Sequence, residues 1–277
     1  MEQLKNSERK LRRHQECNGR RLFLMGLAIA TSLFIILTQF QRVNAHNSEL
    51  TKEQNDSLPA PQIHPLPTPL AQWQDATDAG DYFSQIKPTP LGYLIWSQFP
   101  IRIYVERPKD PTEASASIQR FQKWVDAVLQ AVQEWTLYLP LEVVTQPEVA
   151  DIAILHERPP LQASFNRETG QFNIPRARSA ETRYEFYLGQ AKNASQQILL
   201  QRFTIKLSPH QTADYTLATA RHELGHALGI WGHSPFPTDT MYFSQVRNPP
   251  QISARDINTL KRIYEQPTRL GWTLIVQ

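Results

Sequence analysis

Cysteine is almost absent from this chain of 277 residues, because Cys17 is the only one. A disulfide framework is therefore excluded, and the fold must rest on packing or on packing with a bound metal. Basic residues are concentrated in residues 1–21, which hold seven Lys/Arg against three Glu, while residues 22–277 hold 22 basic and 23 acidic side chains. No basic stripe with interleaved aromatic residues follows the tail, so nucleic acid is not an expected partner.

Charge is missing altogether from residues 22–40, LFLMGLAIATSLFIILTQF. Nineteen such residues can cross a bilayer as a helix, and a buried core helix would carry a polar stripe that this segment lacks. Arg20 and Arg21 precede the segment, so the positive-inside rule keeps residues 1–21 in the cytoplasm as a basic tail and sends the rest of the chain across the membrane. We predict a single-pass membrane protein. Cleavage near Ala45, which would make the protein secreted, is the alternative.

Residues 41–92 are polar and then proline-rich, and they predict an extended spacer between the membrane and a folded domain. Three aromatic residues leave open whether residues 71–92 pack on that domain instead. The compact domain is expected from residue 93 to residue 266, and residues 267–277 are expected to form a C-terminal tail.

The pattern within residues 93–266 is typical of one domain of the α+β class. Alternating or continuous apolar residues predict short strands at 101–105, 141–145, 151–155, 182–188 and 203–207. Asp110-Pro111-Thr112-Glu113 has the residues of a helix start, and apolar residues then follow at spacings of three and four as far as Trp135. We expect this long amphipathic helix to lie across a sheet.

A second helix is predicted to end at Gly229 within the segment HELGHALGIWGHS, residues 222–234. Leucines occupy one face of this helix, and His222 and His226 occupy the opposite face. Neutral imidazoles four residues apart on a helix can coordinate one zinc ion. Glu223 is rotated by about 100° from His222, so it can reach a water bound at the metal more easily than the metal itself. Chance produces this pattern on the order of once per hundred chains of this length, but here it lies on an amphipathic helix.

The motif formed by His222, Glu223, His226, Gly229 and His233 resembles that of the metzincin zinc peptidases. Their motif is H-E-x-x-H-x-x-G-x-x-H followed by a methionine turn. The residues HELGHALG followed by HS are most similar to the matrixin branch. In that branch the glycine lets the chain leave the helix sharply, so that the third histidine meets the metal.

Three further features support the resemblance, which covers about residues 93–266. Met241 follows His233 by eight residues, SARDINTLKRIYE resembles the closing helix of matrixins, and the order of elements agrees. The resemblance implies a matrixin-like catalytic domain with a mixed twisted sheet, a long helix, an active-site helix and a C-terminal helix. The implied ligands of one catalytic Zn²⁺ are His222, His226 and His233. It also implies Glu223 as general base and Met241 as the structural Met turn beneath the metal.

One departure concerns the connection to the third histidine. Three residues, rather than the family's two, follow the glycine: Ile230, Trp231 and Gly232. The extra residue would misplace an imidazole unless the loop bulges outward, and Gly232 is the residue best able to take the required backbone angles. His233 is the expected third ligand, with Asp239 and His210 as rivals.

Protein or peptide substrates are implied, paired as extended chains with an exposed edge strand. Residues 182–188 have the corresponding place in chain order, and residues 243–251 would form one wall of the specificity pocket. Tyr242 is expected to pack. Latency through a thiolate is not expected, because Cys17 lies on the cytoplasmic side. No loop with repeated acids predicts a Ca²⁺ site, although binding through backbone carbonyls stays open.

The predicted function is that of a membrane-anchored zinc endopeptidase acting on extracytoplasmic proteins. The alternative is a non-catalytic, membrane-anchored binding module that keeps the fold. The acid at position 223 favours the peptidase, since a binding module has no use for it. A hydrolase of other amide bonds, such as those of cell-wall peptides, would use the same residues.

Overall fold

A computed structural model describes residues 58–274, except residues 111, 114, 162–163, 168, 174–177 and 191–195. The described residues belong to one unit, Ser57–Gln277. The expected cytoplasmic tail, the membrane span at residues 22–40 and the cleavage site near Ala45 lie outside the described residues. No helix within the described part is both long and apolar enough to span a membrane.

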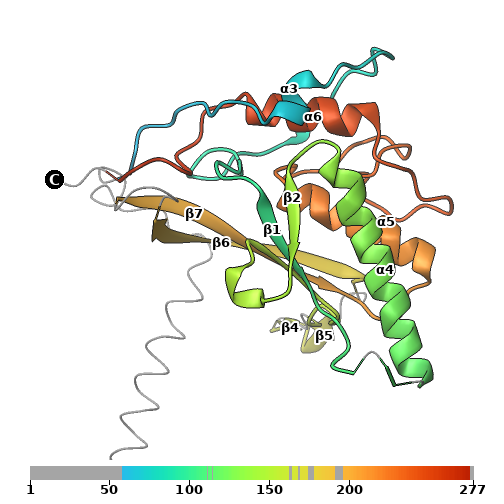
Figure 1. The fold of residues 1–277 in the computed structure, drawn as a ribbon. Helices are drawn as coiled ribbons and strands as arrows, with labels where there is room; N and C mark the ends of the chain where they lie inside the picture. Colours follow the sequence, from blue (N-terminus) through green and yellow to red (C-terminus); the bar gives the residue numbers. More distant parts are fainter. Residues whose placement is uncertain are drawn as a thin grey trace, which may run out of the picture. The chain divides into compact units, whose positions relative to one another are not determined.

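A mixed five-stranded sheet with the strand order β2-β1-β3-β7-β6 forms the centre of this unit (Figure 1). The strands are β1 Ile101–Val105, β2 Leu141–Val144, β3 Ile152–Leu155, β6 Ala180–Gln190 and β7 Gln197–Leu207. All neighbouring pairs are parallel except β6 and β7, which are antiparallel. A separate antiparallel pair comprises β4 Ser164–Asn166 and β5 Gln171–Asn173. The predicted α+β class with a mixed sheet is confirmed.

Strands β6 and β7 are longer than their sequence patterns predict. Each spans 11 residues, and they pair from Ala180↔Leu207 to Gln190↔Gln197. Antiparallel pairing bonds the facing backbone groups of the two strands whatever side chains they carry, so it continues past the alternating segments. Since β6 stands last in the strand order, its outer side has no strand partner among the described residues.

Helices pack against the sheet and against one another. They are α3 Thr68–Gln72, α4 Ala116–Thr136, α5 Ala213–Ala227 and α6 Ala254–Tyr264, with 3₁₀ turns η1 Phe83–Gln85 and η2 Pro147–Val149. Helix α4 contacts β1 and β2, and α5 contacts α4, β6 and β7 (Figure 1). Trp135 of α4 is fully buried, and its indole N–H donates to the carbonyl of Arg221 on α5 at 2.9 Å. Truncating a buried tryptophan costs about 3–5 kcal/mol, so this residue joins the two helices firmly.

The expected start of the long helix at Asp110 is wrong, because α4 begins at Ala116. Ser115 is the residue that caps it, and its hydroxyl accepts from the backbone N–H of Ile118 at 3.3 Å. The Asp110 side chain instead accepts hydrogen bonds from the backbone N–H and the hydroxyl of Thr112, two residues further along the chain. Aspartate and serine serve in caps and in turns alike, so the local sequence contains two plausible starts.

The expected spacer ends earlier than residue 92, because residues 58–92 pack on the domain; we call them the N-terminal strap. Four of its side chains belong to the hydrophobic core: Leu70, Tyr82, Ile86 and Leu91. The strap also pairs with the C-terminal segment, since Gln62 and Thr268 exchange backbone hydrogen bonds of 3.0 and 2.9 Å. Prolines fix the backbone angle φ but do not prevent the side chains between them from packing. Residues 267–274 are also part of the domain, since Thr268 pairs with Gln62 and Leu270 is buried.

Candidate metal centre

Helix α5 ends where the sequence predicts, and the way it ends carries the chain toward the third histidine. The N–H of Ile230 donates to the carbonyl of Gly225 at 2.9 Å, and the N–H of Gly229 donates to that of His226 at 3.1 Å. These two bonds form a Schellman motif, in which the residue after the helix takes a positive φ. Gly229 has φ +130°, and a Cβ there would lie 2.8 Å from the carbonyl oxygen of Leu94. Only glycine fits this turn.

The three predicted ligands come together at the end of α5. His222 and His226 project from the helix and His233 from the following loop, and one ring nitrogen of each lies within 4.8 Å of the others. The ring centroids are 4.7 to 5.3 Å apart. A tetrahedral ion with Zn–N bonds of about 2.1 Å would hold such nitrogens about 3.4 Å apart. Small side-chain movements therefore bring the three nitrogens to ligand distance.

Backbone carbonyls orient the two helical histidines. The Nδ1 of His222 lies 2.8 Å from the carbonyl oxygen of Thr240, and the Nδ1 of His226 lies 2.8 Å from that of Ile230. A carbonyl only accepts, so each Nδ1 carries the proton and each Nε2 keeps a free lone pair. Burial, with a smaller contribution from His222, lowers the pKa of His226 well below its usual value. Each ring is thus held with its Nδ1 toward a carbonyl, which leaves Nε2 as the atom that can bind a metal.

The extra residue before His233 is absorbed by two tight turns. The N–H of Trp231 donates to the carbonyl of Gly229 at 2.8 Å, and the N–H of Gly232 donates to that of Ile230 at 2.9 Å. The Trp231 ring then packs edge-on against Tyr184 of β6, with centroids 4.9 Å apart.

The reason expected for Gly232 is wrong. Its φ is not among the positive values found in the described part of the chain, so unusual backbone angles do not require a glycine here. A Cβ at this position would instead collide with the backbone of Gln85 and the side chain of Ile86. Gly232 is needed because the loop presses against the N-terminal strap.

Met241, expected from the resemblance to lie beneath the metal, packs against α5. The Met241 side chain is fully buried. Its sulfur packs so closely on Gly225 that a Cβ at this glycine would overlap it. Gly225 lies between His222 and His226 in the sequence. The Met241 carbonyl accepts from the N–H of Ser234 at 2.8 Å. The turn is therefore bonded to the residue that follows His233, and through Thr240 it is also bonded to His222.

The Met turn is held from α6 as well. Asp256, which also closes the capping box of α6 with Ser253, accepts from the N–H of Thr240 at 2.9 Å. The same carboxylate accepts from the hydroxyl of Tyr82 in the strap at 2.6 Å. One buried acid thus connects the strap, the last helix and the backbone that orients His222.

The two rival ligands lie elsewhere. Asp239 is fully buried, and its carboxylate accepts from the hydroxyl of Ser234 at 2.6 Å and from two guanidinium nitrogens of Arg255 at 2.9 to 3.1 Å. That carboxylate is already paired. His210 is exposed and outside the histidine cluster. Burial lowers the pKa of His156, Glu106 opposes this shift, and the charge of His210 adds a smaller lowering.

Glu223 lies beside the histidine cluster and is held by a residue that the sequence did not single out. The hydroxyl of Thr182, on β6, donates to Oε2 of Glu223 at 2.6 Å. Burial raises the pKa of Glu223, while the charge of His222 and this hydrogen bond lower it. The alternation of β6 places residues 182, 184 and 186 on one face, but the sequence does not show that this face meets α5.

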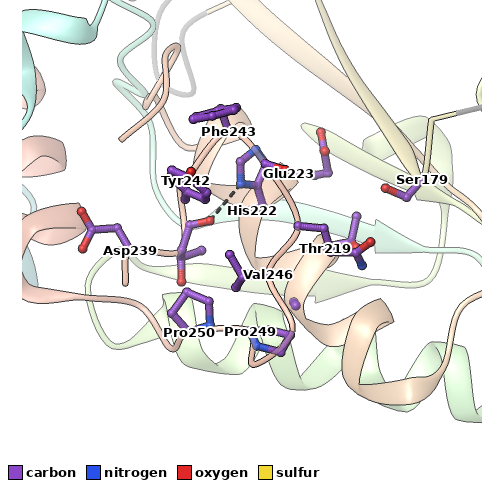
Figure 2. Close-up of a pocket in the computed structure, with 14 residues that line it drawn as sticks. Ser179, Thr219, His222, Glu223, Asp239, Tyr242, Phe243, Val246, Pro249 and Pro250 are labelled. Carbon is purple, nitrogen blue, oxygen red and sulfur yellow. Dashed lines mark hydrogen bonds between the residues drawn. The ribbon is translucent and has the colours of Figure 1, made fainter. Parts of the chain in front are cut away.

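A pocket of about 170 Å³ opens next to His222 and Glu223 (Figure 2). The segment proposed as a pocket wall does line it, through Phe243, Ser244, Gln245, Val246, Pro249 and Pro250. Tyr242, for which only packing was expected, lines it too, with its ring centroid 4.5 Å from that of Phe243. The dashed bond in Figure 2 is that from His222 to the Thr240 carbonyl.

Neither a scan of the chain against protein-family models nor a search of curated proteins found a match. The function is therefore inferred from the chemistry of the site.

Proposed function

We propose that this chain is a membrane-anchored zinc endopeptidase of the matrixin-like type, acting on proteins outside the cytoplasm. The observation that carries the proposal is the convergence of three imidazoles, one acid and a pocket: His222, His226 and His233 cluster within 4.8 Å, with Glu223 beside them. The membrane anchor at residues 22–40 rests on the sequence alone. The likeness to matrixins rests on the motif and on the order of elements.

The donor set suits zinc in particular. Three nitrogen ligands from the protein leave a fourth position open, as in catalytic zinc sites, and both helical rings present Nε2 because their Nδ1 atoms face carbonyls. Zinc, when bound, supplies Lewis acidity that lowers the pKa of water and polarises a carbonyl group. Softer ligands such as thiolates are absent from the cluster, which disfavours copper(I) or an iron–sulfur centre.

Glu223 is the residue placed to move the proton. With Oε2 engaged by Thr182, Oε1 is left to take a proton from the attacking water. It then passes that proton to the amine nitrogen as the C–N bond breaks. An extended substrate can add to the open side of β6, and one of its side chains can enter the pocket beside His222.

Cleavage of an unfolded protein by the full chain in detergent tests this function. We expect cleavage that a chelator abolishes and that Glu223→Ala lowers by about 10²- to 10⁴-fold while zinc stays bound. Zinc bound at unit stoichiometry without any cleavage would favour the non-catalytic binding module. A chain that binds no zinc would overturn both the metal site and the peptidase.

A further inference from the structure

A second cavity lies away from the histidine cluster, where the sheet is incomplete. Strand β3 pairs with β7 only from Ile152↔Phe203 onward. Residues 197–202 of β7 therefore extend beyond the first residue of β3. There the N–H of Gly271 donates to the carbonyl of Leu199 at 2.7 Å in place of a strand. A cavity of about 280 Å³ remains beside this contact. We call it the distal pocket, lined among others by Trp96, Arg102, Asp151, Tyr187, Gln190 and Gln201.

Gln201 is the unusual residue of the distal pocket. Its side chain is only 3% exposed, and neither its amide oxygen nor its amide nitrogen has a hydrogen-bond partner. Among the described residues it is the one buried side chain with both a donor and an acceptor unpaired. Buried polar groups nearly always have partners, so an orphan amide beside a cavity indicates a partner from outside the chain.

The charges around the cavity indicate what kind of partner fits. Asp151 neutralises Arg102 through bonds of 3.0 Å to Nε and 2.8 Å to Nη2, which leaves Nη1 as a free donor. Tyr187 is the only other titratable residue of the lining. The lining is therefore balanced in charge, and an ion would gain no net attraction there.

We propose that the distal pocket binds an uncharged amide, either a small carboxamide or the amide of a peptide. An amide has a C=O and an N–H side by side, which match the donor and the acceptor that Gln201 leaves unpaired. Its carbonyl can also accept from Nη1 of Arg102, and its carbon atoms can contact the indole of Trp96, whose own N–H is already bonded to the Ala227 carbonyl at 2.8 Å. This inference does not depend on the peptidase function.

Saturation-transfer NMR on the full chain in detergent tests the proposal with propionamide as the probe. Methyl propionate, which lacks the N–H, is the control ligand. We expect saturable binding of propionamide, with a dissociation constant on the order of millimolar, and at least tenfold weaker binding of the ester. A chelator should change neither result, because the histidine cluster is not involved.

Gln201→Met is the decisive variant, and Gln197→Met is its matched control, which lies exposed on the same strand and outside the lining of the pocket. Gln201→Met should lose at least tenfold in propionamide affinity, yet unfold at the same or a higher temperature, since it removes an unpaired amide. A capped triglycine that binds tenfold tighter than propionamide would identify a peptide as the ligand, and equal affinity would identify a small amide. Binding that is absent, equal for the ester, or unchanged in Gln201→Met would overturn the proposal and leave water as the partner of Gln201.

Discussion

At the scale of single residues, Glu223, the proposed general base, accepts from a hydroxyl of a different element. Thr182 satisfies one oxygen of Glu223, a carboxylate that burial makes harder to ionise. A catalytic base must be ionised at the working pH. If Glu223 is the base, we expect this hydroxyl to affect its ionisation as well as the packing.

Replacing Thr182 by valine should lower kcat/KM by about 10- to 100-fold, the equivalent of one hydrogen bond to a charged group. The pKa of Glu223 should rise, so the acidic limb of the pH–rate profile should move to higher pH. Zinc content should not change, and Thr182→Ser, which keeps the hydroxyl, should behave as the parent. An unshifted profile in Thr182→Val would show that the hydroxyl only packs.

Histidine protonation should make the metal-free chain sensitive to acid. Burial lowers the folded-state pKa of His226 below its unfolded value, so the unfolded chain binds the proton more readily. The free energy of unfolding should then fall as the pH drops below about 6.5 toward the folded-state pKa, by up to about 1.4 kcal/mol per pH unit for one group.

Denaturant unfolding at pH 5, 6 and 7 in the presence of a chelator measures this effect. The His226→Gln variant has no titrating ring at this position, so its stability should fall less steeply between pH 7 and pH 5. Parallel pH dependences in the two proteins would contradict the prediction. Saturating zinc should flatten the curve of the parent, because the metal competes with protons for the imidazoles.

At the scale of elements, helix α6 holds the loop that carries His233. Ser234 donates to the buried Asp239, and Asp239 is paired in turn with Arg255 of α6. Unlike His222 and His226, His233 has no carbonyl bonded to its ring within the described part. The ion pair is therefore one of the contacts that fix the third imidazole, beside the backbone hydrogen bond from Ser234 to Met241.

Arg255→Ala should lower zinc affinity by about 10- to 100-fold, as loss of an outer support of a metal site does. It should also change the visible spectrum of the cobalt-substituted protein, which a loss of stability alone would not do. Arg262→Ala is the matched control, because Arg262 lies on the same helix and pairs with Asp81 at 2.9 Å on the surface. Equal zinc affinity in the two variants would show that Asp239 and Arg255 only stabilise the fold.

The elements that could be predicted are those whose signal is local. Helix α5 and the common face of His222 and His226, two of the proposed ligands, follow from the 3.6-residue period and from Gly229, and both lie within one short segment. The start of α4 could not be decided, since Asp110 and Ser115 are both suitable caps. The hydrogen bond from Thr182 to Glu223 was not predictable either, because it joins residues 41 positions apart.

At the scale of the whole molecule, the sequence left open where packing on the domain begins, and the structure has it begin before residue 71. Proline-rich composition indicates a spacer only where the side chains between the prolines stay in water. Here Leu70 and Tyr82 are buried, and Tyr82 donates to Asp256 behind the Met turn. Sequence composition reports what a segment contains and not what it packs against, so the strap emerges only from the tertiary structure.

A chain that begins at residue 93 should therefore fail to fold, although the motif-bearing region is intact. Burying one large apolar side chain contributes about 1.5–3 kcal/mol, so losing four from the strap removes about 6–12 kcal/mol. A domain of this kind is stable by only about 5–15 kcal/mol. Circular dichroism and thermal unfolding should show cooperative melting for a chain that begins at residue 57 and none for the shorter one. Equal melting of the two would mean that the strap lies on a finished domain, and the link from Tyr82 through Asp256 to the Met turn would then be dispensable.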